Sequence, residues 1–361
     1  MKTALIVGAT GVIGEAALAR FAAAGDWDAI ALSRRQPEPV LNGSFRHLSL
    51  DLGNAAACAA ACQQLTAVTH VIYAAVSEQP GLVSGWHDRQ QMQLNLNMLS
   101  NLIDPLCEAA PALQHVTLLQ GAKAYGAHAG HRPALPAREN APRVPHDNFY
   151  WLQEDYLRDK AAACDFDWTI FRPQVVVGAT PGAAMNPLLA FAAYAAIRRF
   201  EGKPFSFPGG ELQLGEIVDA DLLAEAFEWA GSSTSARRQT FNITNGDVCA
   251  WREVWPTLAD LFGIEQGPDE PLQLAQYLGD RSAIWDEIVR RHGLRPLSLK
   301  SFLGESHHYA DILLRKDATA IQRPMLLSTI KLRKAGFTGC RDSEEVLRRL
   351  VMEMKMRRLI P

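Results

Sequence analysis

The sequence has few cysteines, no long apolar run and no excess of charge of either sign. Its six cysteines are scattered and none stands in C-x-x-C spacing, which argues against a disulfide framework or a zinc site and predicts reduced packing residues in a cytosolic chain. The longest apolar run, Leu188–Ile197, has ten residues, whereas a helix that crosses a bilayer needs about 20. The net charge of −3 points neither to nucleic acid nor to an anionic membrane as a partner.

What is present is the composition of an ordinary globular protein. Hydrophobic residues make up 48% and charged residues 21%, which rules out wholesale disorder. At roughly 100–200 residues per domain, a chain of 361 residues predicts one large domain or two medium ones. The N-terminal apolar stretch reaches Gly8 too soon to be a signal peptide, so we expect a cytoplasmic protein, and we expect no metal site.

Short β-branched runs alternate with amphipathic stretches through the first half of the chain. Such alternation predicts a parallel sheet with helices on both faces. The expected strands are Ala4–Val7, Ala29–Leu32, Phe45–Leu50, His70–Ala75, His115–Leu119 and Trp168–Arg172. The expected helices are Gly11–Ala24, Ala55–Leu65, Met92–Glu108 and Phe149–Ala163. The predicted fold class is therefore α/β, a doubly wound parallel sheet of the Rossmann type.

Beyond Gly178 the regular alternation of strands and helices gives way to a mixed pattern. Helices are expected at Asp219–Trp229, Trp251–Phe262 and Ser343–Met356, with a short strand at Phe241–Thr244. We interpret residues 1–178, which contain the glycine-rich run 8–14 at the start of the first expected helix, as a nucleotide-binding domain. Residues 179–361 are interpreted as a smaller, mixed α/β cap that is interleaved with this domain and completes a substrate pocket. Met185–Tyr194 would supply apolar pocket surface, although most of Leu188–Ile197 is better explained as a core helix.

Residues 127–147 contain four prolines and predict a surface loop that is long enough to be functional. Three histidines lie in this loop: His128, His131 and His146. They lack metal-ligand partners at suitable spacing, so we interpret them as polar loop residues. The sequence leaves open whether the loop closes over a ligand.

Residues 8–14 read Gly-Ala-Thr-Gly-Val-Ile-Gly, between an expected strand and an expected helix. Glycines there permit a tight turn and let backbone N–H groups approach a pyrophosphate at the helix N-terminus. The strand–turn–helix context makes this run a dinucleotide-binding fingerprint. The residues expected to contact the dinucleotide are Gly8, Thr10, Gly11, Val12, Ile13 and Gly14.

The end of the second expected strand indicates which dinucleotide binds. Chains that bind NAD carry a carboxylate there for the ribose 2′-hydroxyl, whereas this chain reads Ser33-Arg34-Arg35. Two guanidinium groups and a hydroxyl suit a 2′-phosphate, so we expect NADPH or NADP as the cofactor. Asp51, just after the third strand, either meets the adenine edge or serves as a turn or helix-capping residue.

A glycine run followed by a later tyrosine suggests a short-chain dehydrogenase/reductase, whose usual catalytic pattern is Y-x-x-x-K. The candidate tyrosine here is Tyr150, but Glu154 stands four residues on. A carboxylate cannot replace the lysine ammonium, because it disfavours negative charge near the phenol. The catalytic serine usual after the fifth strand is also missing, since the segment reads Leu119-Gln120-Gly121.

These departures resemble one subgroup, the progesterone 5-beta-reductase and iridoid synthase family. The segments that carry the resemblance are 118–126 (LLQGAKAYG), 148–155 (NFYWLQED), 171–178 (FRPQVVVG), 242–247 (NITNGD) and 359–361 (LIP). The most specific feature is a displaced lysine, Lys123, on the loop after the fifth strand, paired with Tyr150 on the following helix. The resemblance covers nearly the whole chain.

The resemblance implies both an activity and a set of residues. The activity is NADPH-dependent reduction of the carbon–carbon double bond of an enone or enal. Hydride goes to the β-carbon, and Tyr150 and Lys123 stabilise the enolate. Besides the glycine turn and the two arginines, the implied cofactor contacts are Ser33, Asp51, Leu52, Ala75, Gln120, Tyr150, Pro173, Val176, Ala183, Ala184 and Met185.

Two rival functions remain on the same fold. An extended-type ketoreductase or sugar-nucleotide epimerase is disfavoured by the missing Y-x-x-x-K pattern, and a non-catalytic NADP-sensing regulator by the presence of both Lys123 and Tyr150. The nearby Tyr125 lies beside Gly126, which favours packing over catalysis. The expected partner is a small apolar carbonyl substrate, without nucleic acid or membrane, and a homodimer is an open alternative.

Overall fold

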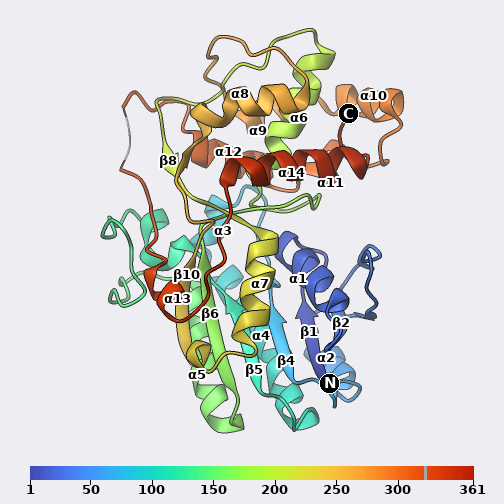
Figure 1. The fold of residues 1–361 in the computed structure, drawn as a ribbon, viewed down its shortest axis with the longest axis vertical. Coiled ribbons are helices and arrows are strands. Elements are labelled where there is room, and N and C mark those ends of the chain that lie inside the picture. Colours follow the sequence, from blue (N-terminus) through green and yellow to red (C-terminus); the bar gives the residue numbers. More distant parts are fainter. Residues whose placement is uncertain (321–322) are drawn as a thin grey trace.

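The computed structural model describes residues 1–320 and 323–361 and has two parts, a sheet domain and a helical cap (Figure 1). The strands of the sheet run toward the cap, which lies over their carboxyl ends. In doubly wound folds ligands bind outside this edge of the sheet. The architecture therefore places a candidate site between the two parts.

The main sheet has seven strands in the order β10-β6-β5-β4-β1-β2-β3. All neighbours pair in parallel, which confirms the predicted sheet. The strand order reverses beside β1, where the glycine turn leaves the sheet. The strands are β1 Lys2–Val7, β2 Trp27–Ser33, β3 Arg46–Ser49, β4 His70–Tyr73, β5 His115–Leu119, β6 Asp167–Pro173 and β10 Gln239–Ile243.

Both faces of the sheet are buried, which explains the continuous apolar runs of its central strands. In β1, Leu5 and Val7 face one core, whereas Ala4 and Ile6 face the other. Successive strand residues point to opposite faces, so one apolar run serves both layers. The helices of the first face are α2 Ala55–Cys62, α4 Arg89–Ala109 and α5 Phe149–Cys164; those of the second are α1 Val12–Ala23, α7 Ala220–Ala230 and α13 Ile330–Lys334.

The cap has a hydrophobic core of its own around α6, with Trp255 and Trp285 fully buried in it. In the run Leu188–Ile197 every residue except Ala196 is buried, and none lines the cleft described below. This run is therefore a core helix. The cap helices are α6 Pro187–Phe200, α8 Trp251–Phe262, α9 Leu274–Gly279, α10 Ser282–His292, α11 Leu299–Leu303, α12 Ser306–Leu314 and α14 Ser343–Met356.

Short elements complete the structure. Two small strand pairs lie outside the main sheet, the parallel pair β7–β9 and the antiparallel pair β8–β11. These short elements are β7 Val175–Val177, β9 Ile217–Asp219, β8 Leu214–Gly215, β11 Cys249–Ala250, α3 Val83–Trp86, and the 3-10 helices η1 Ala122–Tyr125, η2 Ala127–Ala129 and η3 Thr234–Ala236.

The chain after Gly178 contributes to both parts of the molecule. α7 packs against α1, and β10 pairs with β6 at the edge of the main sheet. The sequence pattern places this strand, expected at Phe241–Thr244, in the cap, and the structure corrects that. Phe241 packs in the same core as Phe171 of β6, because an added strand covers apolar surface that the edge of the sheet would otherwise expose. A division into units at residue 178 stays a proposal.

The expected helices form with small changes at their ends. α4 begins three residues before the expected Met92, because the Asp88 carboxylate accepts a hydrogen bond from the Gln90 N–H at 2.8 Å and caps the helix. α2 ends at Cys62 rather than at Leu65. α8 and α14 have the bounds that the sequence predicts.

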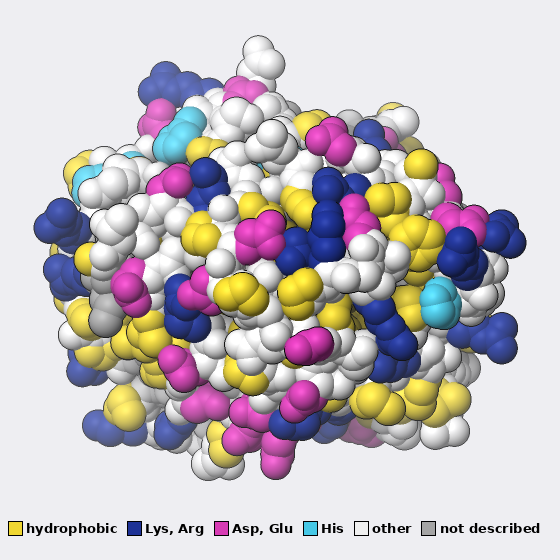
Figure 2. Space-filling model, turned by 90° about the horizontal axis from the view of Figure 1, so that it is seen from above, with side chains coloured by type: hydrophobic (Ala, Val, Ile, Leu, Met, Phe, Trp, Pro, Cys, Tyr) yellow, Lys and Arg dark blue, Asp and Glu magenta, His cyan; other side chains and the backbone are white. Residues whose placement is uncertain are grey.

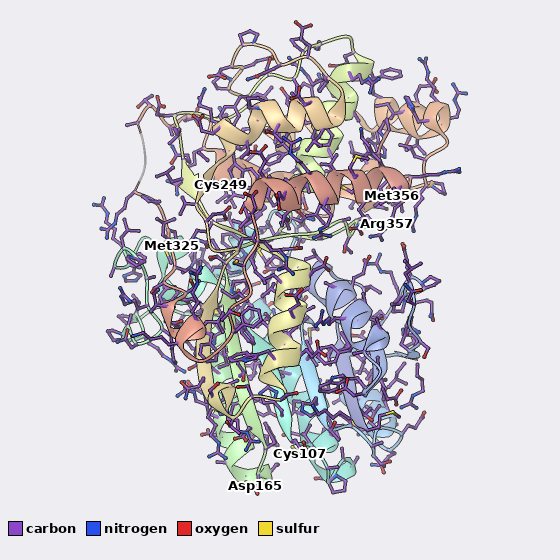
Figure 3. The ribbon with its side chains drawn as sticks, viewed as in Figure 1. Cys107, Asp165, Cys249, Met325, Met356 and Arg357 are labelled. Carbon is purple, nitrogen blue, oxygen red and sulfur yellow. The ribbon has the colours of Figure 1, made fainter. Side chains whose placement is uncertain are left out.

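Ion pairs join the cap to the sheet domain. Arg357, just after α14, contacts Glu15 of α1 at 2.8 Å and Glu38 of the loop after β2 at 3.1 Å. Figure 3 shows Arg357 near the level where the cap meets the sheet domain, with Cys107 and Asp165 at the opposite end of that domain. Arg295 adds a second contact to Glu38 at 2.5 Å. These pairs help to hold the cap over the carboxyl ends of the strands.

The outer face of the cap carries charges of both signs. Figure 2 shows Lys and Arg side chains interspersed with Asp and Glu across this face. The six cysteines are free. Within residues 1–320 and 323–361, no helix combines the length and apolarity needed to cross a membrane.

Candidate active site

The glycine turn leads from the end of β1 into α1. Gly8 has φ of 85°, and a Cβ there would lie 2.9 Å from the backbone of Ala75. A Cβ at Gly14 would lie 2.1 Å from the Gly8 carbonyl oxygen. Both positions need glycine so that the turn and the helix pack closely. Gly11 is the exposed N-cap of α1 and has no capping side chain, so the N–H groups of the first turn are open to an anion.

A cleft of about 820 Å³ lies along the carboxyl ends of the strands, walled on the other side by cap residues. Every site residue predicted from the sequence lines it except Gly14, which is buried behind the turn. The predicted residues that line the cleft are Gly8, Thr10, Gly11, Val12, Ile13, Ser33, Arg34, Arg35, Asp51, Leu52, Ala75, Gln120, Lys123, Tyr150, Pro173, Val176, Ala183, Ala184 and Met185. The fold thus brings together predicted site residues that are spread over half of the chain.

Arg34 and Arg35 are exposed side chains of this cleft. Among the residues that the structure describes, neither guanidinium has an ion-pair partner. The buried Ser33 hydroxyl donates to the Arg35 carbonyl at 2.6 Å and shapes the turn that presents them. The first carboxylate after β2, Glu38, is already held by two arginines of the cap. This end of the cleft is therefore cationic and suits an anionic group.

Asp51 follows β3, and its carboxylate accepts a hydrogen bond from the Gly53 N–H at 3.0 Å. The N-cap of α2 is instead Asn54, which accepts from the Ala57 N–H at 3.0 Å. Of the alternatives open from the sequence, Asp51 is thus a turn residue rather than a helix cap. It also lines the cleft, and its contact with an adenine stays a prediction.

Lys123 and Tyr150 come from different elements and meet in the cleft. Lys123 lies in η1 after β5, and Tyr150 lies in the first turn of α5. The Lys123 Nζ is 5.6 Å from the centre of the Tyr150 ring. Asn148 positions both residues, because its Oδ1 accepts from the Tyr150 N–H and its Nδ2 donates to the Lys123 carbonyl, each at 3.1 Å.

Burial controls the protonation of this pair. It raises the pKa of Tyr150 far above the usual range, and the negative charge of Glu78 raises it further. Tyr150 therefore keeps its proton as a hydrogen-bond donor. Burial lowers the pKa of Lys123, and the Glu78 carboxylate 3.5 Å from Nζ opposes this. No residue in the described part of the chain accepts a hydrogen bond from the Tyr150 hydroxyl, so this donor is available to a ligand.

Glu154, which occupies the lysine position of Y-x-x-x-K, does not line the cleft. It is 2% exposed, and its carboxylate lies 2.6 Å from Arg158, 3.1 Å from Arg143 and 3.4 Å from Arg172. Gln120 donates to the same carboxylate at 2.8 Å and accepts from Arg172 at 2.7 Å. Three arginines neutralise the carboxylate, so its role is to hold α5 against β5 and β6.

Tyr125 lies close to Lys123 in the chain but is not part of the cleft wall. Its buried hydroxyl donates to the Asn242 Oδ1 at 2.6 Å. The Asn242 Nδ2 in turn donates to the carbonyls of Ala137 and Ser328. Tyr125 thus ties η1 to β10 and to two loops, in agreement with the packing interpretation.

Among the side chains of the cleft wall that sequence reasoning missed, four bear on its chemistry. Glu78 and Trp86 lie between β4 and α4, and Glu305 and Tyr309 lie at the beginning of α12. The Trp86 ring centre is 4.4 Å from the Lys123 Nζ, and burial raises the pKa of Tyr309. No local motif marks these residues, because docking of the cap and of the segment before α4 brings them to the cleft.

The three loop histidines form a cluster with His87. The His128 ring centre lies 5.2 Å from that of His146 and 5.8 Å from that of His87, and His131 lies 5.8 Å from His146. Burial and the nearby Lys123 charge lower the pKa of His128 to about 4. Across the described ranges, no group of three His, Cys, Asp or Glu side chains could hold a metal ion. The ring distances show a packing of aromatic rings beside Lys123.

Comparison with known proteins decides the family. Residues 51–307, more than half of the chain, match the PRISE-like Rossmann-fold domain. This chain belongs to the PRISE-like family. The "(S)-8-oxocitronellyl enol synthase" of Antirrhinum majus is 32% identical over 379 residues, covering 100% of this chain and 93% of that protein. The enzyme of the same name from Catharanthus roseus is 30% identical and covers 100% of this chain and 92% of that protein.

Two of the solved structures that are similar to this PRISE-like chain are sugar-nucleotide epimerases. The UDP-glucose 4-epimerase of Thermotoga maritima has a TM-score of 0.69 at 15% identity and covers 99% of both chains. The UDP-glucose 4-epimerase of Thermus thermophilus, solved with NAD, has a TM-score of 0.66 at 19% identity and covers 98% of this chain and 99% of that one. At these identities the likeness concerns the fold. The predicted family and the predicted Rossmann-type fold class are both confirmed.

Proposed function

We propose that this PRISE-like chain is an NADPH-dependent oxidoreductase that reduces the activated carbon–carbon double bond of an enone or enal. The observation that carries the proposal is the pair of Lys123 and an unpartnered Tyr150 hydroxyl in the cleft. Relatives at about 30% identity are named as enol synthases. Addition of hydride to the β-carbon of an enal, followed by protonation on oxygen, yields an enol, which agrees with this chemistry.

One end of the cleft fits NADPH. The open N-terminus of α1 would hold the pyrophosphate, and Arg34 and Arg35 would hold the 2′-phosphate. No free carboxylate follows β2 to favour NAD, because Glu38 is held by cap arginines. When bound, NADPH supplies the hydride.

The chain's own contribution is to stabilise negative charge on the substrate oxygen. The Tyr150 hydroxyl donates a hydrogen bond to the carbonyl oxygen, and this bond strengthens as the oxygen becomes an enolate. The raised pKa of Tyr150 keeps the proton on the phenol. Lys123 adds positive charge beside the same ring. The two residues thus act on the transition state more than on the bound substrate.

The substrate end of the cleft suits a small apolar carbonyl compound. Trp86, Met185 and Tyr309 present apolar surface, and Ala183 and Ala184 leave room beside them. Such a pocket holds the carbon skeleton by burial, whereas the catalytic pair recognises its single carbonyl oxygen.

The decisive experiment follows NADPH oxidation with a panel of enals, cyclic enones and conjugated steroids, each beside its saturated counterpart. We expect turnover of conjugated compounds and none of saturated ketones. Turnover of saturated ketones alone would overturn the proposal in favour of a ketoreductase. Interconversion of UDP-sugars without net NADPH oxidation would instead favour an epimerase, the activity named for the structural neighbours.

A non-catalytic NADP-sensing regulator is the third alternative. It would bind NADPH tightly and oxidise it with no member of the panel. The presence of both Lys123 and Tyr150 in one cleft disfavours this alternative. A homodimer also stays a prediction, which light scattering of the purified chain tests.

A further inference from the structure

Glu78 lies in the segment between β4 and α4, and α4 holds this segment rigidly. The buried Asn95 bonds both backbone groups of Ser77, accepting from its N–H at 2.8 Å and donating to its carbonyl at 2.9 Å. The buried Gln91 accepts from the Gln79 N–H at 2.8 Å and donates to the Glu78 carboxylate at 3.0 Å. The direction of the carboxylate is thus determined by four hydrogen bonds from one helix.

This carboxylate meets the Lys123 ammonium in a nearly closed environment. The Glu78 Oε1 lies 3.5 Å from the Lys123 Nζ, and the two side chains are 4% and 13% exposed. The ring centres of Trp86, Tyr150 and Phe149 lie 4.4, 5.6 and 5.7 Å from the same Nζ. Aromatic faces attract a cation, but a buried ammonium keeps its charge only beside an opposite charge.

We propose that Glu78 is a positioning residue for the catalytic pair: its carboxylate holds the Lys123 ammonium charged and fixed in the cage of three rings. The expected effect on kcat rests on the proposed function, because in that reaction Lys123 acts through its positive charge. The contact between the two side chains stands independently of which substrate is reduced. Glu78 acts through Lys123 and needs no contact with the substrate.

Three titratable groups of the same site, His128, Tyr150 and Tyr309, stay neutral over the pH range of an assay. The His128 pKa is lowered to about 4, so this imidazole is uncharged above that pH. The pKa values of Tyr150 and Tyr309 are raised by burial, so both phenols keep their protons. A loss of activity at alkaline pH would therefore report the deprotonation of Lys123. Because an opposite charge within 4–6 Å shifts a pKa by about one to three units, removal of the Glu78 charge should move this loss to lower pH.

The first test is the pH profile of kcat for Glu78→Gln, which keeps the size of the side chain and removes its charge. The alkaline limb should move down by about one to three pH units, while the KM for NADPH stays within a few-fold. Glu78→Asp keeps the charge at a greater distance from Lys123, so its alkaline limb should lie between those of the wild type and Glu78→Gln. Glu287→Gln, at a half-buried glutamate of α10 that is paired with Arg290 and does not line the cleft, is the matched control and should leave the profile unchanged. A profile that does not move in either Glu78 variant would overturn the inference.

The second test reads the charge of Lys123 without turnover. Acetic anhydride acetylates a lysine amine only in its neutral form. After brief labelling, mass spectrometry compares the Lys123 peptide with that of the exposed Lys300. At equal pH, Lys123 should be modified faster in Glu78→Gln than in the wild type, with Glu78→Asp again between them. If Glu78→Gln does not fold, Glu78→Asp carries the test.

The two readouts separate failure of the inference from failure of the proposed function. Unchanged labelling in an active enzyme refutes the role of Glu78 and leaves the function standing. Accelerated labelling in a chain that reduces no enone supports the ion pair and refutes the function.

Discussion

Replacement of Tyr150 by phenylalanine removes only the hydroxyl group that is proposed to stabilise the enolate. The substitution keeps the ring, which packs on Phe149 at 4.5 Å between centres and lies 5.6 Å from the Lys123 Nζ. No described side chain or backbone group accepts a hydrogen bond from the hydroxyl. Its removal therefore leaves no buried partner unpaired, and the melting temperature should stay within about 2 °C of the wild type.

The expected loss of activity follows from what the hydroxyl does in the transition state. A donor aimed at a developing oxyanion contributes about 10²–10³ in rate, or roughly 2.7–4 kcal/mol. We therefore expect kcat for an enone to fall by this factor in Tyr150→Phe. The Kd for NADPH should change by no more than a few-fold, because the interaction gains its strength only as the enolate forms.

Tyr125→Phe is the matched control, and it should show the opposite pattern. This change removes the hydroxyl that donates to the buried Asn242 Oδ1 at 2.6 Å. An unpaired buried acceptor costs about 1–3 kcal/mol, so the melting temperature should fall by a few degrees. The hydroxyl is outside the cleft, and kcat should stay near that of the wild type.

Both variants are measured by steady-state NADPH oxidation, by fluorescence titration with NADPH and by thermal unfolding. Full activity in Tyr150→Phe would refute the assignment of the phenol. If Tyr125→Phe lost activity at temperatures where it is folded, Tyr125 rather than Tyr150 would be the catalytic phenol. Equal loss of stability in both variants would show that the Tyr150 hydroxyl has a structural partner.

Three further predictions concern the cofactor end, the glycine turn and a buried carboxyl. The double change Arg34→Ala and Arg35→Ala should weaken NADPH binding at least about 10²-fold, since charge-assisted hydrogen bonds contribute about 1.5–3 kcal/mol each. The Kd for NADH should stay within a few-fold of the wild-type value. Equal losses of affinity for both cofactors in fluorescence titration would contradict a 2′-phosphate site. Gly14→Ala places a Cβ 2.1 Å from a carbonyl of the turn and should lower both the melting temperature and NADPH affinity, whereas Gly25→Ala, which meets open space, should change neither. Burial raises the pKa of Glu216 from 4.5 to about 7, so the folded chain binds this proton more tightly than the unfolded chain and loses stability as pH rises from about 4.5 to 7. Glu216→Gln should therefore be more stable than the wild type by about 1–3 kcal/mol above pH 7 and equally stable below pH 4.5, and urea unfolding with the same difference at both pH values would refute the burial of its charge.

Features that depend only on residues close together along the chain could be predicted from the sequence. The glycine turn follows from the φ and the close approach that Gly8 and Gly14 must adopt. The apolar strands follow from burial on both faces, and the absence of a carboxylate next to Arg34 and Arg35 is read directly from the chain. The displaced Lys123 was found by resemblance to a family, because the usual Y-x-x-x-K spacing from Tyr150 leads to Glu154 instead. Nearly all of the predicted site residues accordingly line one cleft.

Only the tertiary structure decided how distant segments meet. The place of β10 in the main sheet depends on pairing with β6, and the neutralisation of Glu154 depends on arginines from three separate positions. The partner of Lys123 is Glu78, 45 residues earlier in the chain, directed by hydrogen bonds from α4. Part of the far wall of the cleft comes from the beginning of α12, almost two hundred residues after Lys123. Local sequence patterns encode turns and strands because their geometry is local. The charge and the enclosure of this site arise instead from contacts between distant segments, some within the sheet domain and some between this domain and the cap.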